Sequence, residues 1–271
     1  MLEDKVFKND KLSNWEVADI NDAELLFAHH FQEECDFLKN ALSSWQLKLE
    51  EHIIKRGGGL ADQTKSLTDI FENQGWKKNN IAIQKRISFQ HTYEDIVSQN
   101  SNTHEIDHLI ENDKGKKIAL EIEWNNKDEF FDRDFQAMRR LYEEGIIEGG
   151  IIITRGPSLE DQLESAIAQY FEHHGVNDFS DFEAIKNRLV DEKGTEKFSF
   201  PTSAQRNDIQ KQMNKGNVKF SMASAKVFKN NKFGGTTTNW RQLQKRIERR
   251  DALRTPILFL GIPAMQIDMS A

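Results

Sequence analysis

The 271-residue sequence predicts an α/β fold, in which a central mixed sheet is flanked by helices. Three observations point to it. The run Gly149–Thr154 is apolar after its two glycines, which is typical of a strand buried at the centre of a sheet. Strand and helix patterns alternate between residues 104 and 175, an order that favours helices on both faces of the sheet. A late apolar run, Ile257–Ile262, predicts a further core strand.

Nothing in the sequence divides the chain, since it contains no internal repeat and no low-complexity linker. We therefore expect one domain over residues 1–271, long enough to bury a substantial core. Its expected parts are an N-terminal helical part (1–60), a core (61–175), a basic elaboration (176–254) and a final core strand (255–264).

The N-terminal part is expected to be mainly helical. Residues 1–20 carry no firm pattern, but apolar residues recur at helical spacing over Asp22–Lys55, which predicts one long or two shorter helices. Cys35, the only cysteine, lies in this pattern and is expected to be buried rather than catalytic. The glycines at 57–59 predict a loop.

Residues 66–124 predict a helix and then strands. A helix is expected over Ser66–Gln74 with Ser66 as its N-cap, and a strand-like region follows over Ile81–Phe89. Glu105–Ile110 and Ile118–Trp124 predict two strands, joined by a polar turn that contains glycine. These two strands can pair as a hairpin.

Acidic residues gather on this hairpin. Side chains alternate along a strand, so Glu121 and Glu123 share one face, and the large apolar residues share the other. Asp107 on the first strand can lie beside them. Three carboxylates repel one another unless a cation lies between them, and oxygen ligands suit a hard ion such as Mg²⁺. The pattern alone leaves open a solvated acidic strand face.

Two further helices are expected beyond the hairpin. They span residues 128–144 and 158–175, with Asp128 and Ser158 as their caps. Residues 176–235 show weak periodicity, which favours loops with short helices.

Charge is unevenly distributed along the chain. The net charge is −7, yet residues 206–254 hold thirteen Lys and Arg against three Asp and Glu, a local net charge of +10. A helix expected over Trp240–Leu253 carries Arg241, Lys245 and Arg249 on its exposed side. Such a segregated basic stretch is typical of a phosphate-binding surface.

Other features narrow the class of protein. The sequence has no apolar run that could span a bilayer and no signal-peptide core, so we expect no membrane contact and a cytoplasmic protein. A single cysteine excludes an internal disulfide. Cysteine and histidine do not recur with zinc-site spacing.

The order Asp107, then a loop, then Glu121-Ile122-Glu123 resembles the nuclease motif D-x(n)-E-x-K, with Glu in the place of Lys. That departure is found in BamHI-type restriction endonucleases, whereas the related BglII and BstYI type has Gln there. The following helix, the run GGIIIT and the late strand ILFLGIP are also similar to this group. The resemblance covers roughly residues 60–155 and 255–264.

This resemblance to BamHI/BglII/BstYI-like type II restriction endonucleases implies a PD-(D/E)XK nuclease core. It implies that Asp107 and Glu121 are catalytic metal ligands for Mg²⁺, and that Glu123 binds metal or acts as general base. It also implies an accessory polar residue near the metal, for which Asn79 is the nearest match.

The residues that follow the second hairpin strand are candidates for DNA contacts. Asn125, Asn126 and Lys127 leave the end of the strand that carries the two glutamates, where they could reach base edges or phosphates. Asparagine is equally natural in a plain turn after a strand. Arg241, Lys245 and Arg249 are the expected phosphate contacts.

The leading hypothesis is a Mg²⁺-dependent type II restriction endonuclease that cuts both strands of double-stranded DNA. Because one chain carries one carboxylate cluster, we expect a symmetric homodimer acting on a short palindrome. The alternative is a sequence-specific DNA-binding protein that keeps the nuclease fold without cleavage. A metal-dependent hydrolase of small phosphoesters is a third possibility, but it would need no extended cationic surface.

Overall fold

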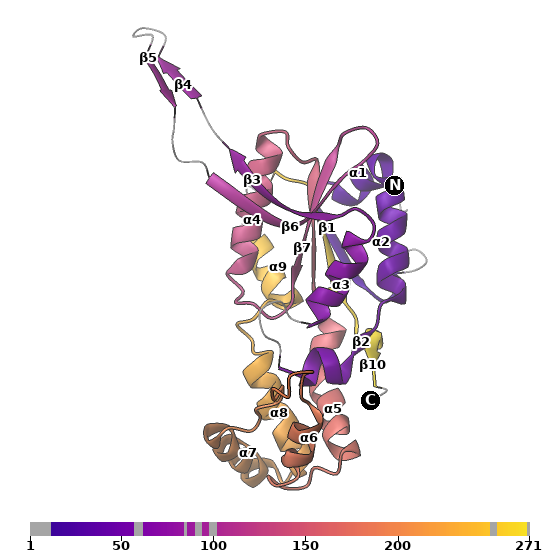
Figure 1. The fold of residues 1–271 in the computed structure, drawn as a ribbon, viewed down its shortest axis with the longest axis vertical. Helices are drawn as coiled ribbons and strands as arrows, with labels where there is room; N and C mark the ends of the chain where they lie inside the picture. The colour runs from indigo at the N-terminus through magenta and orange to yellow at the C-terminus, as the bar shows by residue number, and fades with distance from the viewer. Residues whose placement is uncertain are drawn as a thin grey trace.

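The structure, a computed structural model, describes residues 12–56, 62–83, 86–89, 94–97, 102–249 and 254–269. Its strands are β1 (Glu16–Ile20), β2 (Leu47–Lys48), β3 (Lys77–Ile83), β4 (Arg86–Phe89), β5 (Glu94–Val97), β6 (Asn102–Glu111), β7 (Lys117–Glu123), β8 (Gly149–Arg155), β9 (Ile257–Ile262) and β10 (Ile267–Asp268). Its α-helices are α1 (Ala23–His30), α2 (Gln32–Ser44), α3 (Asp62–Glu72), α4 (Phe130–Glu143), α5 (Pro157–His173), α6 (Phe182–Arg188), α7 (Ser203–Gly216), α8 (Phe220–Lys232) and α9 (Trp240–Glu248). A π-helix, η1 (Leu49–Ile54), and a 3₁₀ turn, η2 (Ala264–Gln266), complete the elements (Figure 1).

A six-stranded mixed sheet forms the centre of the molecule. Its strand order is β1-β9-β8-β7-β6-β3. The pairs β9/β8 and β8/β7 are parallel, whereas β1/β9, β7/β6 and β6/β3 are antiparallel. Every residue of β8 is buried, as expected for a parallel strand in the middle of a sheet. The sequence-based expectation of a mixed sheet with a buried central strand is therefore confirmed.

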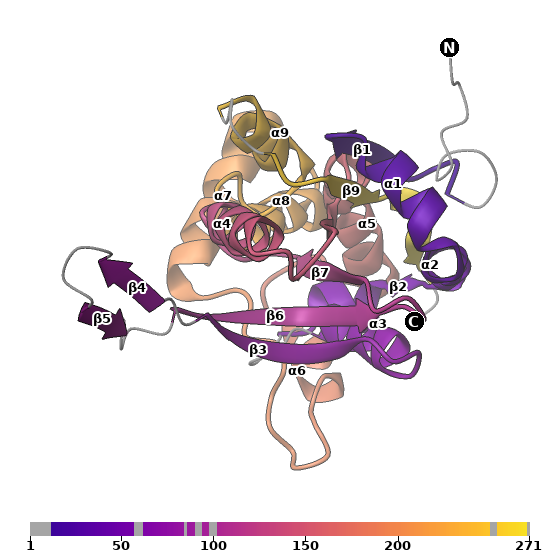
Figure 2. The ribbon, with the colours of Figure 1, turned by 90° about the horizontal axis from the view of Figure 1, so that it is seen from above.

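Helices cover both faces of this sheet (Figure 2). Alternate residues of β7, β8 and β9 enter two separate clusters of buried apolar side chains. One cluster contains residues of α4 and α9, and the larger one contains residues of α1, α2, α3, α5 and α8. Gly149 lets β8 start close to its neighbours, because a methyl group there would lie 2.6 Å from the carbonyl oxygen of Pro256. The predicted α/β class is confirmed.

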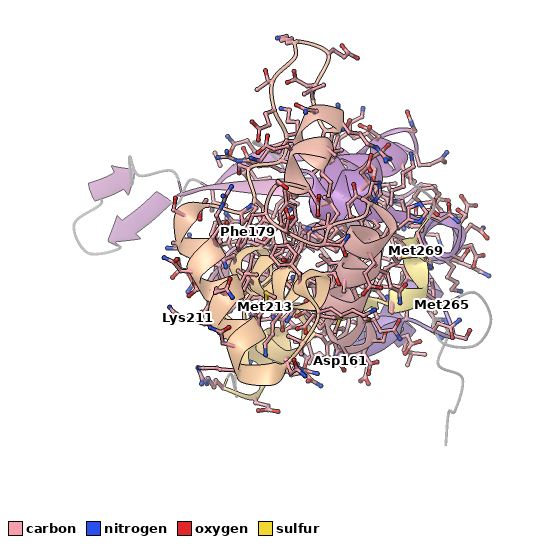
Figure 3. The ribbon with its side chains drawn as sticks, turned by 90° about the horizontal axis from the view of Figure 1, so that it is seen from below. Asp161, Phe179, Lys211, Met213, Met265 and Met269 are labelled. Carbon is pink, nitrogen blue, oxygen red and sulfur yellow. The ribbon has the colours of Figure 1, made fainter. Side chains whose placement is uncertain are left out.

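Two parts extend beyond the sheet. Helices α6, α7 and α8 lie past one end of it, and Figure 3 views the molecule from that end. A group of phenylalanine side chains packs there, among them Phe171, Phe182 and Phe200, whose ring centroids lie 5.3 to 6.1 Å apart. At the opposite end the two-stranded sheet of β4 and β5 projects away from the body (Figures 1 and 2).

Three expected helix starts differ from the structure. Helix α3 begins at Asp62, so Ser66 lies inside it and its hydroxyl donates to the carbonyl oxygen of Gln63. Helix α4 begins at Phe130, and Asp128 lies before its N-cap residue, Glu129. Neither Ser66 nor Asp128 is therefore the helix cap that the sequence predicted.

Ser158 is also wrong as a cap. Helix α5 begins at Pro157, which is favourable at a first helical position because proline has no N–H to satisfy. The Ser158 hydroxyl accepts a hydrogen bond from the backbone N–H of Ala264, 3.1 Å away. The chain after β9 therefore docks onto the start of α5.

Other expectations need smaller corrections. The region 22–55 holds two α-helices and a π-helix, and Cys35 in α2 is buried as expected. The region 176–235, expected to hold loops and short helices, contains α7 and α8 with 14 and 13 residues. The strand-like region 81–89 divides between two sheets, because β3 joins the central sheet and β4 pairs with β5.

Two further expectations fall wholly or partly outside the described residues. The glycine loop at 57–59 lies there, and so do residues 250–253 of the helix expected up to Leu253. Within the unassigned first twenty residues, the described part contains β1, which pairs with β9 at the edge of the sheet. Over the described parts of the chain, no helix is long and apolar enough to cross a membrane.

Candidate active site

The predicted hairpin is present and places the acidic residues at one end of the sheet. Strands β6 and β7 pair antiparallel, with His108 opposite Leu120 and Glu111 opposite Lys117. The turn between them is closed by Asn112, whose side-chain oxygen accepts the backbone N–H groups of Lys114 and Lys116, 3.0 Å from each. The hairpin therefore fixes the register of the two strands that carry the carboxylates.

The three predicted carboxylates come together. Glu121 and Glu123 lie on the face of β7 that α4 covers, and their exposed fractions are 3% and 2%. Asp107 on β6 is half-buried, and its backbone N–H donates to Oε1 of Glu121 at 3.4 Å. The alternative of a solvated acidic strand face is wrong, because two of the three groups are removed from water.

A fourth carboxylate, which the sequence did not lead us to expect, belongs to this cluster. Asp134 projects from α4 and is 2% exposed. Its neighbour Arg133 donates from Nε and Nη2 to Oδ1 of Asp134, both at 3.2 Å, and its Nη2 lies 3.6 Å from Oε1 of Glu123. Asp134 occupies the same helical face as the buried Phe131 and Met138, three residues after one and four before the other. A carboxylate within an apolar helical stripe is the sequence signal that could have found it.

Burial changes the protonation of this cluster. The pKa of Glu123 is raised to about 9, first by removal from water and then by the charge of the neighbouring Asp134 carboxylate. Burial also raises the pKa of Asp134 to about 6, against the lowering effect of the Arg133 guanidinium. The pKa of Glu121 is raised well above its usual value, first by burial and then by the charges of Asp134 and Asp107. The free protein therefore retains protons here at neutral pH.

The donor set of the cluster fits a hard divalent cation. All four groups offer oxygen only, which is the ligand type that Mg²⁺ and Ca²⁺ take. Among the described residues, no three His, Cys, Asp or Glu side chains are already arranged as a metal cage. The carboxyl groups of Glu121 and Asp107 contact each other, as do those of Glu123 and Asp134, and a cation bound among them would displace any proton that they share.

The residues after β7 form a short loop, Asn125–Asp128, called here the post-strand loop. Asn126 is exposed and donates from Nδ2 to Oε2 of Glu123 at 3.0 Å. Lys127 is largely exposed, and its Nζ lies 4.0 Å from a Glu129 carboxylate oxygen. Asn125 is half-buried. Thus the structure brings the candidate DNA-contacting residues next to the carboxylates, and it ties one of them to Glu123 directly.

A second segment, Gly235–Asn239, called here the bracing loop, lies against the post-strand loop. The backbone N–H of Thr238 donates to the carbonyl oxygen of Asn126 at 2.8 Å, and that of Asp128 donates to the carbonyl oxygen of Thr236 at 3.0 Å. Lys127 and Thr237 form an isolated antiparallel bridge between these hydrogen bonds. No local pattern indicates this pairing, because more than a hundred residues separate the two loops.

The tentative accessory residue, Asn79, lies on β3 beside the strand of Asp107. It is opposite Ile106 in the register, and its side-chain amide donates to the carbonyl oxygen of Lys77 at 2.9 Å. The Nζ of its neighbour Lys78 pairs with Glu105 at 2.7 Å. The pKa of Lys78 is raised by this hydrogen bond and by the nearby charges of Asp107 and Glu121.

The basic stretch does not form one continuous face. Helices α7 and α8 lie past the end of the sheet, where Figure 3 labels Lys211, while α9 lies beside α4. On α9, the buried Trp240 and Leu243 face the sheet, and Arg241, Lys245 and Arg249 are exposed. Arg241 pairs with Asp161 at 2.6 Å.

Arg246, on the inner side of α9, joins this helix to α4. Its Nη2 lies 2.9 Å from Oδ2 of Asp128, and its Nη1 also donates to Asp132. These ion pairs explain why Asp128 does not cap α4. They also connect the helix with the exposed cations to the end of the post-strand loop.

Comparison with known proteins places the chain beside one group of nucleases. The family model described as restriction endonuclease BglII/BglIII matches residues 15–262, which is most of the chain. No curated protein sequence matches the chain.

We predict that the metal-free protein loses stability as the pH rises. A carboxyl group with a raised pKa in the folded state binds its proton more tightly there than in the unfolded chain. For Glu123 this stabilisation is complete below the ordinary value of 4.5 and is lost as the pH rises through about 9. Glu123→Gln should therefore flatten the decrease of the unfolding free energy over this range of pH. Denaturant titrations in EDTA would measure it, and equal pH dependence in both proteins would contradict it.

Proposed function

The chain belongs to the restriction endonuclease BglII/BglIII family, and from this premise we propose that it cuts both strands of double-stranded DNA at a short palindromic site with Mg²⁺ as its cofactor. Family membership makes it a DNA-binding hydrolase, a site-specific deoxyribonuclease. The observation that supports the finer proposal is the cluster of buried carboxyl groups at the end of β7, beside two loops that offer amide and cationic side chains. Buried like charges of this kind are costly unless a cation uses them.

Asp107 and Glu121 are the proposed metal ligands, and Glu123 is a ligand or the general base. When bound, a divalent cation polarises the scissile phosphate and neutralises charge on the leaving oxygen. Glu123 in its ionised form can accept a proton from the attacking water, and the Arg133 guanidinium 3.6 Å away stabilises that form. Asn126 restricts the Glu123 side chain through its 3.0 Å hydrogen bond.

Asp134 is proposed as a fourth member of the site. Its carboxyl group contacts Glu123 and receives two hydrogen bonds from Arg133, so it positions both. Because it comes from α4, it also ties the acidic end of β7 to that helix. With Asp134, the proposed site contains a residue from a helix as well as residues from the two strands that carry the nuclease motif.

Asn125, Asn126 and Lys127 are the proposed base and phosphate contacts, with Arg241, Lys245 and Arg249 as phosphate contacts farther along the duplex. Asparagine can make two hydrogen bonds to adenine, and lysine can reach guanine or phosphate. Only Trp124 separates Glu123 from the post-strand loop, so a duplex held by this loop would also be held beside the carboxylates. Asn79 remains a tentative accessory residue, on the strand next to Asp107.

Incubation with phage DNA and Mg²⁺, followed by sequencing of the fragment ends, tests the proposed function. A defined set of ends with two-fold symmetric flanking sequence is the expected result. Sequence-specific binding without cleavage in any divalent metal would instead favour the alternative, a non-cleaving DNA-binding protein.

Replacing Asp107, Glu121 or Glu123 by Ala should reduce cleavage by about 10³-fold or more, with DNA binding largely retained, because these groups act through the metal. Asp134→Asn should cost less activity and raise the Mg²⁺ concentration that gives half-maximal cleavage. Glu111→Ala is the matched control, since Glu111 is an acidic residue at the other end of β6 that pairs with Lys117. Near-normal cutting by Glu121→Ala would contradict the assignment.

Neutralising Arg241, Lys245 and Arg249 together should weaken DNA binding and make it less dependent on salt. The slope of log affinity against log salt should fall by about one for each phosphate group that the variant no longer binds. Arg241 already pairs with Asp161, so we expect the two other residues to contribute most of the change. Lys114→Gln, in the hairpin turn at the far end of β7, is the control. An unchanged slope in the triple variant would show that α9 faces away from DNA.

The proposed working unit is a symmetric homodimer. Each chain supplies one carboxylate cluster, and a two-fold axis places one cluster at each strand of a palindrome. The exposed side of α4 is the candidate surface; there Arg139 and Glu143 pair at 2.7 Å and could exchange partners across an axis. Sedimentation with and without a short cognate duplex measures the assembly state. A monomer in both conditions that nicks one strand would exclude the symmetric dimer.

A further inference from the structure

Arg155 is the last residue of β8, the strand beside β7, and its side chain is fully buried. Its guanidinium packs over the rings of Trp124 and Phe233, 5.8 and 4.9 Å from their centroids. Nη1 lies 3.1 Å from Oε1 of Glu160 on α5. A charge buried so deeply is costly unless it is paired and its donors are used. The partners of those donors therefore show what the charge stabilises.

The partners lie on the bracing loop. Nε and Nη2 of Arg155 donate to the carbonyl oxygen of Thr238 at 3.2 and 2.7 Å. Nη2 also donates to the hydroxyl oxygen of Thr237 at 2.7 Å. One planar side chain thus binds two adjacent residues of a segment that lies 82 and 83 positions away in the sequence. A planar fork of donors is the geometry that arginine offers and lysine does not.

The bracing loop is in turn hydrogen-bonded to the post-strand loop. The hydrogen bonds from Thr238 to Asn126 and from Asp128 to Thr236 join the two loops on either side of Lys127. Trp124, which precedes the post-strand loop, packs against the same guanidinium. Arg155 therefore contacts the residue before the post-strand loop through its ring, and it restrains the loop itself indirectly, through the backbone hydrogen bonds of the bracing loop.

The bracing loop also leads into α9. Asn239 is the N-cap of that helix, and its side-chain oxygen accepts the backbone N–H of Gln242 at 3.1 Å. The direction of α9, with its exposed cations, is thus set from the same loop that Arg155 holds. One buried charge connects the residues proposed to read bases with those proposed to bind phosphates.

We propose that Arg155 is a positioning residue that holds the post-strand loop in register with the carboxylates and thereby sets the sequence discrimination of the enzyme. The effect on discrimination rests on the proposed function, whereas the restraint on the loop does not. Arg155 itself is buried and touches no substrate. If the loop could shift, Asn126 and Lys127 would still be present, but they would contact non-cognate base pairs with a smaller loss of binding free energy.

Two substitutions test this inference. Arg155→Lys keeps the charge but removes the fork, and Thr237→Val removes one acceptor of Arg155 and keeps the shape of the side chain. Thr237 is half-buried, and the second substitution also removes the hydrogen bond that its hydroxyl donates to the carbonyl oxygen of Gly234 at 2.7 Å. The backbone N–H bond of Thr237 to the same oxygen remains. Arg188→Lys is the matched control, since Arg188 pairs with Glu50 at 2.8 Å between α6 and η1, apart from both loops.

The first measurement needs no DNA. Amide hydrogen exchange of the intact chain should become faster by about tenfold or more at Asp128 and Thr238 in the Arg155 and Thr237 variants, relative to the strands β7 and β8. The Arg188 variant should leave these two amides unchanged. Unchanged exchange in both variants of the bracing contacts would overturn the restraint itself, whether or not the wild-type protein cuts DNA.

The second measurement is the ratio of single-turnover cleavage rates at the cognate site and at sites that differ by one base pair. We expect this ratio to fall about tenfold in Thr237→Val and further in Arg155→Lys, while the cognate rate at saturating Mg²⁺ falls less. The Arg188 variant should keep the wild-type ratio. If Arg155→Lys fails to fold, Thr237→Val decides. An unchanged ratio together with faster exchange would overturn the link to discrimination, and a wild-type protein that cuts no DNA would overturn the proposed function instead.

Discussion

Burial of several carboxyl groups at one end of β7 is the constraint on which the rest of the structure depends. Each charge in this place costs free energy, so the surrounding fold must be stable enough to keep Glu121, Glu123 and Asp134 out of water. The sheet supplies that stability through a central strand buried along its whole length and apolar clusters on both faces. Their raised pKa values keep these carboxyl groups protonated, which lowers the free-energy cost of burying them in the absence of a cation. In the proposed function, a cation that binds to these groups would therefore release the protons that they hold.

The same end of the sheet collects the groups that face DNA in the proposed function. The parallel strands β7, β8 and β9 end together, and segments distant in sequence meet where they end. The post-strand loop continues the strand of the glutamates, and the bracing loop pairs with it and opens α9. Arg155, at the end of β8, is buried and donates hydrogen bonds to Thr237 and Thr238 of the bracing loop. The post-strand loop is near the carboxylates because it adjoins β7 in the chain, whereas the bracing loop and the start of α9 are brought there from a distant part of the chain.

The sequence was sufficient for those parts of the fold that local periodicity determines. Alternation in residues 118–124 predicted which face of β7 carries the glutamates, and the apolar run at 149–154 predicted the central strand. Asp134 was not predicted, because a carboxylate does not add to the apolar periodicity of a helix, although its spacing from Phe131 places it in the buried stripe. The edge strand β1 was not predicted, because its five residues show no strand pattern of their own and are recognised as a strand only by their pairing with β9. The contacts of Arg155 could not be found at all, because nothing local distinguishes an arginine that ends a buried strand from one that reaches solvent.

The distribution of charge bears on how an acidic protein handles DNA. Many cations of the basic stretch are paired with carboxylates of the same chain, as Arg241 is with Asp161, Lys219 with Glu172 and Lys229 with Glu160. A phosphate must displace such a carboxylate before it gains the contact, so each pair reduces the affinity for DNA of any sequence. Non-specific binding is the competitor of specific binding in a genome, and weakening it raises the specificity ratio. If the post-strand loop reads bases as proposed, these internal ion pairs reduce general attraction more than cognate binding, because only the correct bases add the contacts of that loop. An overall charge of −7 is then compatible with selective DNA binding, since selectivity depends on the difference between two affinities and not on the larger of them.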